Sequence, residues 1–172
     1  MRDFELSEFK GLTKVEEQIL PIKSLKCFIN GSKICTKKIE EKDDQIFLAY
    51  DYKNKEVDKI IENEIIPIVI GNDLKPIRAK DKIVNYDFMC KICQQIQESK
   101  YLLADITDNN FNVGLELGIA IGFQKITMII ANKNSKEIGG LKRTDSIRYD
   151  IENVEKLKSD FSNMLVNIIK SN

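Results

Sequence analysis

The stretch Ala104-Asp-Ile-Thr-Asp-Asn-Asn-Phe-Asn-Val-Gly-Leu-Glu-Leu-Gly-Ile-Ala-Ile-Gly122 decides the fold. Residues 101–107 have the composition of a buried strand, and an Asp- and Asn-rich turn follows them. Over residues 109–124 the only charged side chain is Glu116. The helix expected there, with Asn112 as its N-cap, is apolar on nearly every side and belongs in an interior.

A lone carboxylate in such a helix must find partners, reach a cleft or lose its charge. The order of strand, turn and helix predicts that Asp105, Asn112 and Glu116 surround one helix N-terminus at a strand end. Ligands of open α/β sheets bind at such strand ends, so these are candidate site residues. The alternative for Glu116 is a first-turn acid stabilised by the helix dipole and partly solvated. The apolar neighbours of Glu116 favour the functional interpretation.

The rest of the chain alternates between strands and helices. Strands are expected at 45–50, 126–131 and 146–150, and amphipathic helices at 86–100 and from Val154 onward. The segment 56–66 has helical spacing, but 65–70 has the composition of a strand that Pro67 would confine to an edge. This alternation predicts an α/β fold: a single domain with a mostly parallel sheet of about five strands and helices on both faces.

We expect residues 1–43 to form a small N-terminal appendage and residues 44–172 to form the α/β domain. Thr13 begins a capping box and thus a short helix, and residues 27–35 are typical of two short strands around Asn30 and Gly31. The charged segment 37–44 is expected to be a solvated connector.

Composition excludes several classes of function. The 27 basic and 27 acidic residues balance, so electrostatics do not favour a nucleic-acid partner. No apolar run reaches the length of a membrane span and the start lacks a signal-peptide core, so a cytoplasmic protein without a membrane partner is expected. The chain has no histidine, which excludes Ser-His and Cys-His nucleophiles and metal sites that need imidazole.

The cysteines leave alternatives open. Cys27 and Cys35 form one pair and Cys90 and Cys93 another, so a zinc site of four thiolates has suitable ligand types. Against it, Cys90 and Cys93 fall one turn apart on an expected helix, without the knuckle turn of such sites. Core packing is the favoured interpretation, since cysteine behaves as a small hydrophobe, and a redox pair is the least favoured.

At residues 112–118, Asn-Val-Gly-Leu-Glu-Leu-Gly, after residues 104–107, Ala-Asp-Ile-Thr, the chain resembles a known signature. Nucleoside 2-deoxyribosyltransferases, deoxynucleotide N-hydrolases and bacterial TIR-like nucleotide-binding domains share it, and the resemblance extends more weakly over residues 44–150. It implies that Glu116 is the catalytic carboxylate, and that Asp105 and Asn112 orient it or hold sugar hydroxyls.

The resemblance also implies substrate-binding residues. Tyr50, Asp51 and Lys53 follow the first strand, beside the sugar or phosphate, with an ordinary surface turn as the alternative. The resemblance favours a helix that continues to about residue 72 over an edge strand at 65–70. It also implies a strand at 75–79, which brings Arg78 to a strand end. There Arg78 meets a phosphate or an acid, or forms a surface ion pair. The remaining candidates are Asp108, Asn110 and Gly114, where Asn110 and backbone amides can receive a phosphate.

The implied activity is cleavage of an N-glycosidic bond in a nucleoside, a deoxynucleotide or a dinucleotide such as NAD, with no cofactor required. Deoxyribosyltransferases place a second acid on the helix before the central strand. That helix here offers Cys90, Ile92 and Cys93, with Asp87 the nearest acid, which favours TIR-like NAD hydrolysis. The resemblance further implies a homo-oligomer and a role in bacterial antiphage defence.

Other classes of function remain open. The same fold can bind or sense a small nucleotide or nucleoside without turning it over, and charge neutrality and the missing second acid are compatible with that. A zinc-stabilised interaction domain is the third alternative.

Overall fold

A computed structural model describes the chain outside residues 1–25, 28–32, 36, 82–87 and 137–145. The chain divides into two compact units, Met1–Lys37 and Lys38–Asn172. The first contains β1 (Lys26–Cys27) and β2 (Lys33–Ile34), which pair antiparallel with Lys26 opposite Ile34. The predicted pair of short strands is therefore confirmed, whereas the helix predicted from Thr13 lies outside the described residues.

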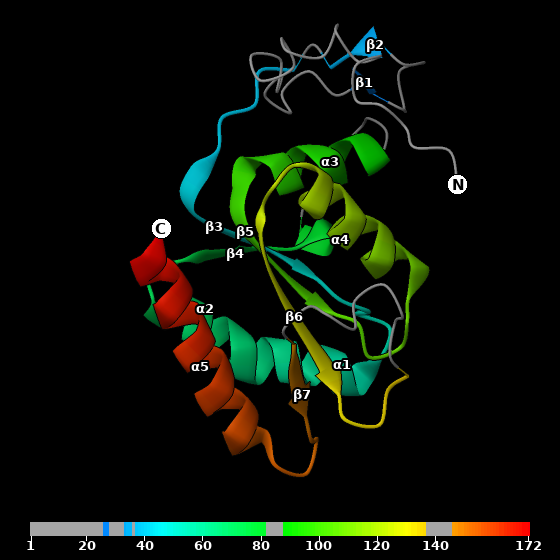
Figure 1. Cartoon of the computed structure of the whole chain (residues 1–172). Coiled ribbons are helices and arrows are strands. Elements are labelled where there is room, and N and C mark those ends of the chain that lie inside the picture. Colours follow the sequence, from blue (N-terminus) through cyan, green and yellow to red (C-terminus); the bar gives the residue numbers. More distant parts are fainter. Residues whose placement is uncertain (1–25, 28–32, 36, 82–87, 137–145) are drawn as a thin grey trace, which may run out of the picture. The chain divides into compact units, whose positions relative to one another are not determined.

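The second unit is built on a five-stranded sheet in the order β4-β3-β5-β6-β7 (Figure 1). Every pair of neighbouring strands is parallel. The strands are β3 (Lys42–Ala49), β4 (Lys75–Ile77), β5 (Ser99–Asp105), β6 (Ile126–Asn132) and β7 (Ile147–Tyr149). The predicted α/β class and parallel sheet are confirmed. The expected connector ends earlier than proposed, because β3 begins at Lys42, although its first residues are exposed.

Helices cover both faces of this sheet (Figure 1). One face carries α1 (Lys55–Ile60), α2 (Ile66–Gly71) and α5 (Val154–Ser171), and the other carries α3 (Phe88–Glu98) and α4 (Phe111–Gly122). Successive residues of β3 alternate between the two buried clusters: Ile46 and Leu48 pack with α1, α2 and α5, and Phe47 and Ala49 with α3 and α4. This alternation is the period of two that a strand imposes.

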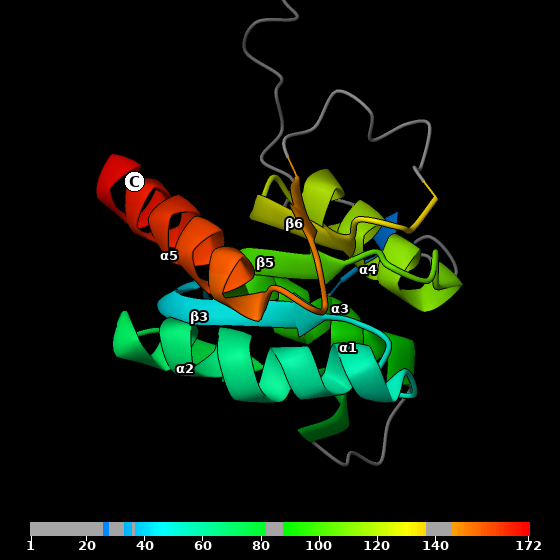
Figure 2. The ribbon, with the colours of Figure 1, turned by 90° about the horizontal axis from the view of Figure 1, so that it is seen from below.

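Residues 65–70 are helical, as the resemblance indicated and composition did not. A π-helical turn, η4 (Ile61–Ile65), joins α1 to α2, and Figure 2 shows the three as one continuous rod. Pro67 stands in the first turn of α2, where its missing N–H costs little. Ile61, Ile65 and Val69 repeat every four residues and are buried against the sheet. Burial of this stripe outweighs the strand propensity of isoleucine.

The expectation that the Glu116 helix lies in an interior holds for only one of its sides. Phe111 is 82% exposed and Ile121 is 51% exposed, and Gly114 and Gly118 lie exposed between them. The sheet covers only the opposite side of α4, through Val113, Leu117 and Ala120. None of the helices in the described part of the chain combines the length and apolar character that a membrane span requires.

The described cysteines bear on the zinc alternative. Cys90 and Cys93 lie on α3, as expected, and neither they nor Cys35 form a disulfide. Among the described residues no group of three or more His, Cys, Asp or Glu side chains is arranged to hold a metal ion. The zinc alternative therefore gains no support there.

Candidate active site

The turn between β5 and α4 sets the position of Glu116. Asn110 is the N-cap of α4: its backbone is extended and its side-chain oxygen accepts a hydrogen bond from the Asn112 N–H at 2.9 Å. Asn109 before it has a φ of 51°, a left-handed conformation that asparagine tolerates. The predicted cap, Asn112, is therefore wrong, because α4 begins at Phe111. Glu116 consequently lies in the second turn of the helix.

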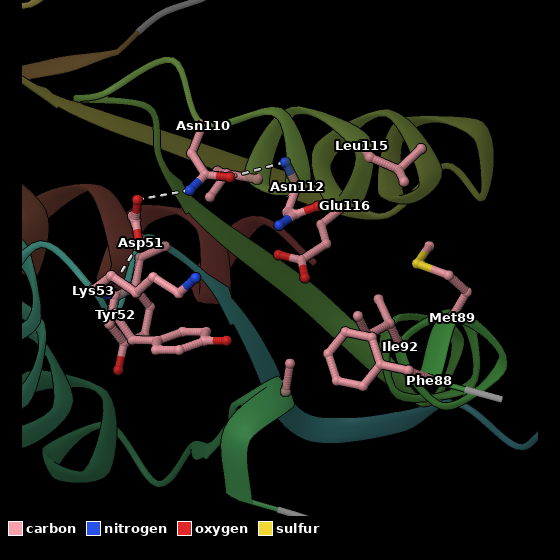
Figure 3. Close-up of a pocket in the computed structure, with 13 residues that line it drawn as sticks. Asp51, Tyr52, Lys53, Phe88, Met89, Ile92, Asn110, Asn112, Leu115 and Glu116 are labelled. Atoms are coloured by element: carbon pink, nitrogen blue, oxygen red, sulfur yellow. Dashed lines mark hydrogen bonds between the residues drawn. The ribbon is translucent and has the colours of Figure 1, made fainter. Parts of the chain in front are cut away.

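The Glu116 side chain is buried and faces a cleft (Figure 3). It is 8% exposed, and no hydrogen bond or ion pair joins its carboxylate to another residue that the structure describes. Burial raises the pKa of Glu116 to about 7. The helix dipole opposes this shift only weakly, because its effect falls off within the first turn.

The cleft has a volume of about 100 Å³ and lies at the carboxyl ends of β3 and β5. Its polar side comes from the turn after β3 and the start of α4, and its apolar side from α3. The described lining residues are Tyr50, Asp51, Tyr52, Lys53, Ala79, Phe88, Met89, Ile92, Asn110, Asn112, Val113, Leu115 and Glu116. Of the sequence-derived candidates, the fold brings together Glu116, Tyr50, Asp51, Lys53, Asn110 and Asn112.

Asn110 ties the two polar turns together. Its Nδ2 donates to Asp51 Oδ2 at 2.7 Å, and Asp51 Oδ1 accepts the backbone N–H of Lys53 at 2.9 Å. A second link joins the same turns, since Asn54 Nδ2 donates to Asp108 Oδ2 at 2.6 Å. Asp108 thus supports the rim and does not line the cleft. The amide of Asn110 is engaged on both sides, so its visible role is to position Asp51 and α4.

Asp105 is not at the cleft. It is 3% exposed, and its carboxylate accepts hydrogen bonds from the Thr107 N–H at 2.9 Å and the Tyr149 hydroxyl at 2.8 Å. Burial raises the pKa of Asp105. This geometry does not favour the catalytic role expected for Asp105. Its oxygens accept hydrogen bonds from Thr107 and Tyr149 instead of facing Glu116. Gly114 also lies outside the described lining, on the exposed side of α4.

Arg78 belongs to a charged cluster behind the cleft. It donates to Glu62 at 2.5 Å and to Asp81 at 2.7 Å, and these partners, Asp81 foremost, raise its pKa. Lys80 bridges Asp58 and Glu62, and the Tyr50 hydroxyl donates to the same carboxylates. The ion-pair alternative for Arg78 is what the structure shows. The cluster holds Tyr50, whose pKa burial raises to about 12, against the cleft.

Of the aromatic residues that line the cleft, sequence reasoning identified Tyr50 but missed two others. Tyr52 and Phe88 line it while staying half exposed, at 50% and 54%. Tyr52 stands between two candidates in the turn, Asp51 and Lys53, so its position was a usable signal. Phe88 has no such signal, because α3 brings it to the cleft only through packing on the sheet. Asp87, the acid nearest to the expected second carboxylate, lies outside the described residues.

The fold and the site define a parallel α/β domain with a carboxylate, at the carboxyl edge of its sheet, that has no partner among the described residues. The chain is similar to the crystal structure of the TIR domain of the Toll-related receptor TRR-2 from Hydra magnipapillata. The TM-score is 0.58 at 15% sequence identity, over 73% of this chain and 97% of that chain. A 2-desoxiribosyltransferase from Leishmania mexicana aligns with a TM-score of 0.49 at 15% identity, over 66% of this chain and 95% of that chain.

No protein-family model matches the sequence, and no curated protein matches it. The TIR-like fold implied by the signature around Glu116 is confirmed, as a likeness of fold.

Proposed function

We propose that this protein cleaves the N-glycosidic bond of a nucleotide or nucleoside, with Glu116 as the catalytic carboxylate. One observation carries the proposal: the Glu116 carboxylate is buried, opens onto a cleft and has no partner among the described residues. Burying an unpaired carboxylate destabilises a fold, so packing alone does not explain it. A perturbed acid in a cleft is the usual signature of a functional group.

The chemistry follows from the charge that develops in the substrate. When the bond between the anomeric carbon and the base breaks, the base leaves with the bonding electrons and the sugar carbon becomes positive. The carboxylate of Glu116 stabilises that carbon, or attacks it to form a glycosyl ester. Water then donates its oxygen to the carbon and releases a proton, and the carboxylate is restored.

The lining of the cleft suits a nucleoside. Figure 3 shows Glu116, Lys53 and Phe88 around one space, with Lys53 on the polar side and Phe88 on the apolar side. The half-exposed rings of Tyr52 and Phe88 offer faces on which a planar base can stack. Lys53 and Asp51 supply groups for a phosphate and for sugar hydroxyls.

The residues that α3 contributes favour NAD as the substrate. Phe88, Met89 and Ile92 line the cleft from this helix, and none of them is an acid that can protonate a leaving base. The nicotinamide of NAD leaves as a neutral molecule and needs no proton, unlike adenine or a pyrimidine. We therefore favour hydrolysis of NAD over transfer of a deoxyribosyl group. The antiphage role and self-association implied by the sequence resemblance belong to the same proposal.

The alternative is a nucleotide-binding module. The cleft volume of about 100 Å³ does not separate the two functions, because either must hold a nucleotide and sites for drug-sized ligands usually span about 300–1,000 Å³. The described residues thus surround the reacting group but not a whole nucleotide.

Incubation of the purified protein with NAD, and separately with a deoxynucleoside and a free base, tests the proposal. Products are resolved by chromatography. We expect nicotinamide and ADP-ribose from NAD, and loss of both with Glu116→Gln. Glu40→Gln is the matched control, because Glu40 is exposed and precedes β3, at the end of the sheet away from the cleft. Unchanged substrates together with measurable nucleotide binding would contradict the enzyme and support the binding module.

A further inference from the structure

A second cavity is lined by residues at the ends of β6 and β7 and at the start of α5. Figure 1 shows these elements at the β7 edge of the sheet. Its volume is about 240 Å³, far above the roughly 10–15 Å³ that one water molecule needs. The described lining residues are Lys133, Arg148, Tyr149, Asp150, Asn153, Lys156 and Leu157, and none of them lines the Glu116 cleft. The cavity is therefore a separate site.

Positive charge dominates this cavity. Lys133, Arg148 and Lys156 line it, and Asp150 is the one acid among the described lining residues. Asp150 is paired with Lys133, and this contact lowers its pKa. The charges of Arg148 and Lys156 thus have no carboxylate partner in the part of the chain that the structure describes. Uncompensated cations around a hollow favour an anionic ligand.

Arg148 is held in place but keeps most of its donors. Its Nη1 donates to Ser135 Oγ at 3.0 Å, and the Ser135 hydroxyl in turn donates to the Asn132 carbonyl at 2.6 Å. A guanidinium has five N–H donors in a fixed plane, so the remaining ones are available to a ligand. This geometry suits the oxygens of a phosphate, which arginine binds in a bidentate manner.

The backbone around the cavity holds its shape and adds positive charge at its edge. The Lys133 N–H donates to the Tyr149 carbonyl at 2.7 Å, which holds the ends of β6 and β7 together beneath the cations. Tyr149 and Leu157 are the buried residues of the cavity lining. The 18-residue helix α5 begins at Val154, and its positive end adds to the field of the cations.

We propose that this cavity binds a phosphate group, with Arg148 and Lys156 as its ligands and Lys133 as a supporting charge. The site takes inorganic phosphate or the phosphate of a small ester, and it acts independently of the Glu116 cleft.

Calorimetric titration at constant ionic strength tests this, with inorganic phosphate, AMP and succinate as probes and chloride as the balancing anion. We expect saturable phosphate binding and a matching rise in melting temperature, since a ligand of the native state stabilises it. Arg148→Gln and Lys156→Gln should each weaken binding about tenfold or more, as loss of a charge-assisted hydrogen bond does. Lys170→Gln, at the far end of α5, is the matched control and should bind phosphate normally.

Comparison of the probes shows whether the site binds inorganic phosphate or the phosphate of an ester. AMP binding that is tighter than phosphate binding and is lost in Arg148→Gln and Lys156→Gln assigns the site to an ester, and equal binding of the two probes assigns it to free phosphate. Succinate binding as tight as phosphate, or phosphate binding that survives in both Arg148→Gln and Lys156→Gln, overturns the proposal. Melting of both variants in chloride checks that they fold. Glu116→Gln should bind phosphate normally, so failure of the proposed catalytic activity leaves this test intact.

Discussion

At the scale of the residue, Glu116 is subject to opposing electrostatic effects. Burial disfavours its charged form, and the positive end of α4 favours it. Burial prevails, since the side chain is 8% exposed and lies beyond the first helical turn, and the pKa rises from 4.5 to about 7. A positive sugar carbon in the cleft favours the anion again. The carboxylate is therefore most strongly charged when the proposed transition state is present.

The raised pKa predicts how Glu116→Gln changes stability. In the native state Glu116 keeps its proton up to about pH 7, whereas in the unfolded state it keeps the proton only up to about pH 4.5. The contribution of this group to the free energy of unfolding therefore falls as pH rises from 4.5 to 7. At about 1.4 kcal/mol per pKa unit, the ionised side chain costs about 3 kcal/mol above pH 7. Urea unfolding should show Glu116→Gln more stable than wild type at pH 8.5 and nearly equal at pH 4.5. Equal stability at pH 8.5 would mean that the carboxylate is solvated.

The same pKa predicts the pH dependence of the proposed reaction. A carboxylate that stabilises or attacks a positive carbon must be anionic, so kcat/KM for NAD should rise tenfold per pH unit below about pH 7 and level off above it. Initial rates from pH 5 to 9 at constant ionic strength measure this rise in kcat/KM. A profile that falls through pH 7 would instead indicate that Glu116 donates a proton.

At the scale of the element, the turn between β5 and α4 is held by a partly buried chain of hydrogen bonds. The Asn132 N–H donates to the Thr107 hydroxyl at 2.9 Å, which lies 3.0 Å from the Tyr149 hydroxyl, and Tyr149 donates to Asp105 at 2.8 Å. These contacts join β5, β6 and β7 at their carboxyl ends. They fix the turn that carries Asn110, and hence the start of the Glu116 helix.

Tyr149→Phe should therefore destabilise the fold. It removes one donor from the buried Asp105 carboxylate and should lower the free energy of unfolding by about 1–3 kcal/mol. Tyr52→Phe is the matched control, because Tyr52 is half exposed and no hydrogen bond of its hydroxyl is seen within the described ranges. Its effect should stay within about 0.5 kcal/mol. Urea unfolding of both variants at pH 7 makes the comparison, and equal effects would remove the structural role assigned to Asp105.

At the scale of the whole molecule, the α/β unit contains its own hydrophobic core. Both buried clusters that pack the helices onto the sheet consist of residues of Lys38–Asn172. Parallel sheets need cover on both faces, and α1, α2 and α5 on one side and α3 and α4 on the other supply it.

Deletion of residues 1–37 should leave this unit folded. We expect cooperative urea unfolding with a free energy within about 1 kcal/mol of the full chain, since no residue of either cluster is removed. Circular dichroism during the titration provides the measurement. A non-cooperative transition in the shortened chain would show that the first unit is required for the fold.

Local patterns were sufficient for much of this structure. The apolar runs of β3, β5 and β6 and the stripe on α3 predict strands and a helix directly, because periods of two and of about 3.6 residues follow from backbone geometry. Residues 65–70 are the exception, since isoleucine favours strands and only the resemblance pointed to the helix. The exposed face of α4 was also missed, because composition reports how apolar a helix is and not how many neighbours it has.

The sequence by itself determined the order of the elements, the α/β class and Glu116 as the candidate catalytic residue, because each depends on neighbours within a few turns or strand positions. Tertiary structure alone decided which side chains meet at the cleft. Asn110 and Asp51 form a hydrogen bond across 59 sequence positions, and Tyr149 and Asp105 form one across 44. Phe88 reaches the cleft because α3 packs on the sheet. Such contacts depend on how strands are ordered in the sheet and on which face each helix covers. The pKa of Glu116 was decided the same way, since it depends on how much water the packed elements exclude.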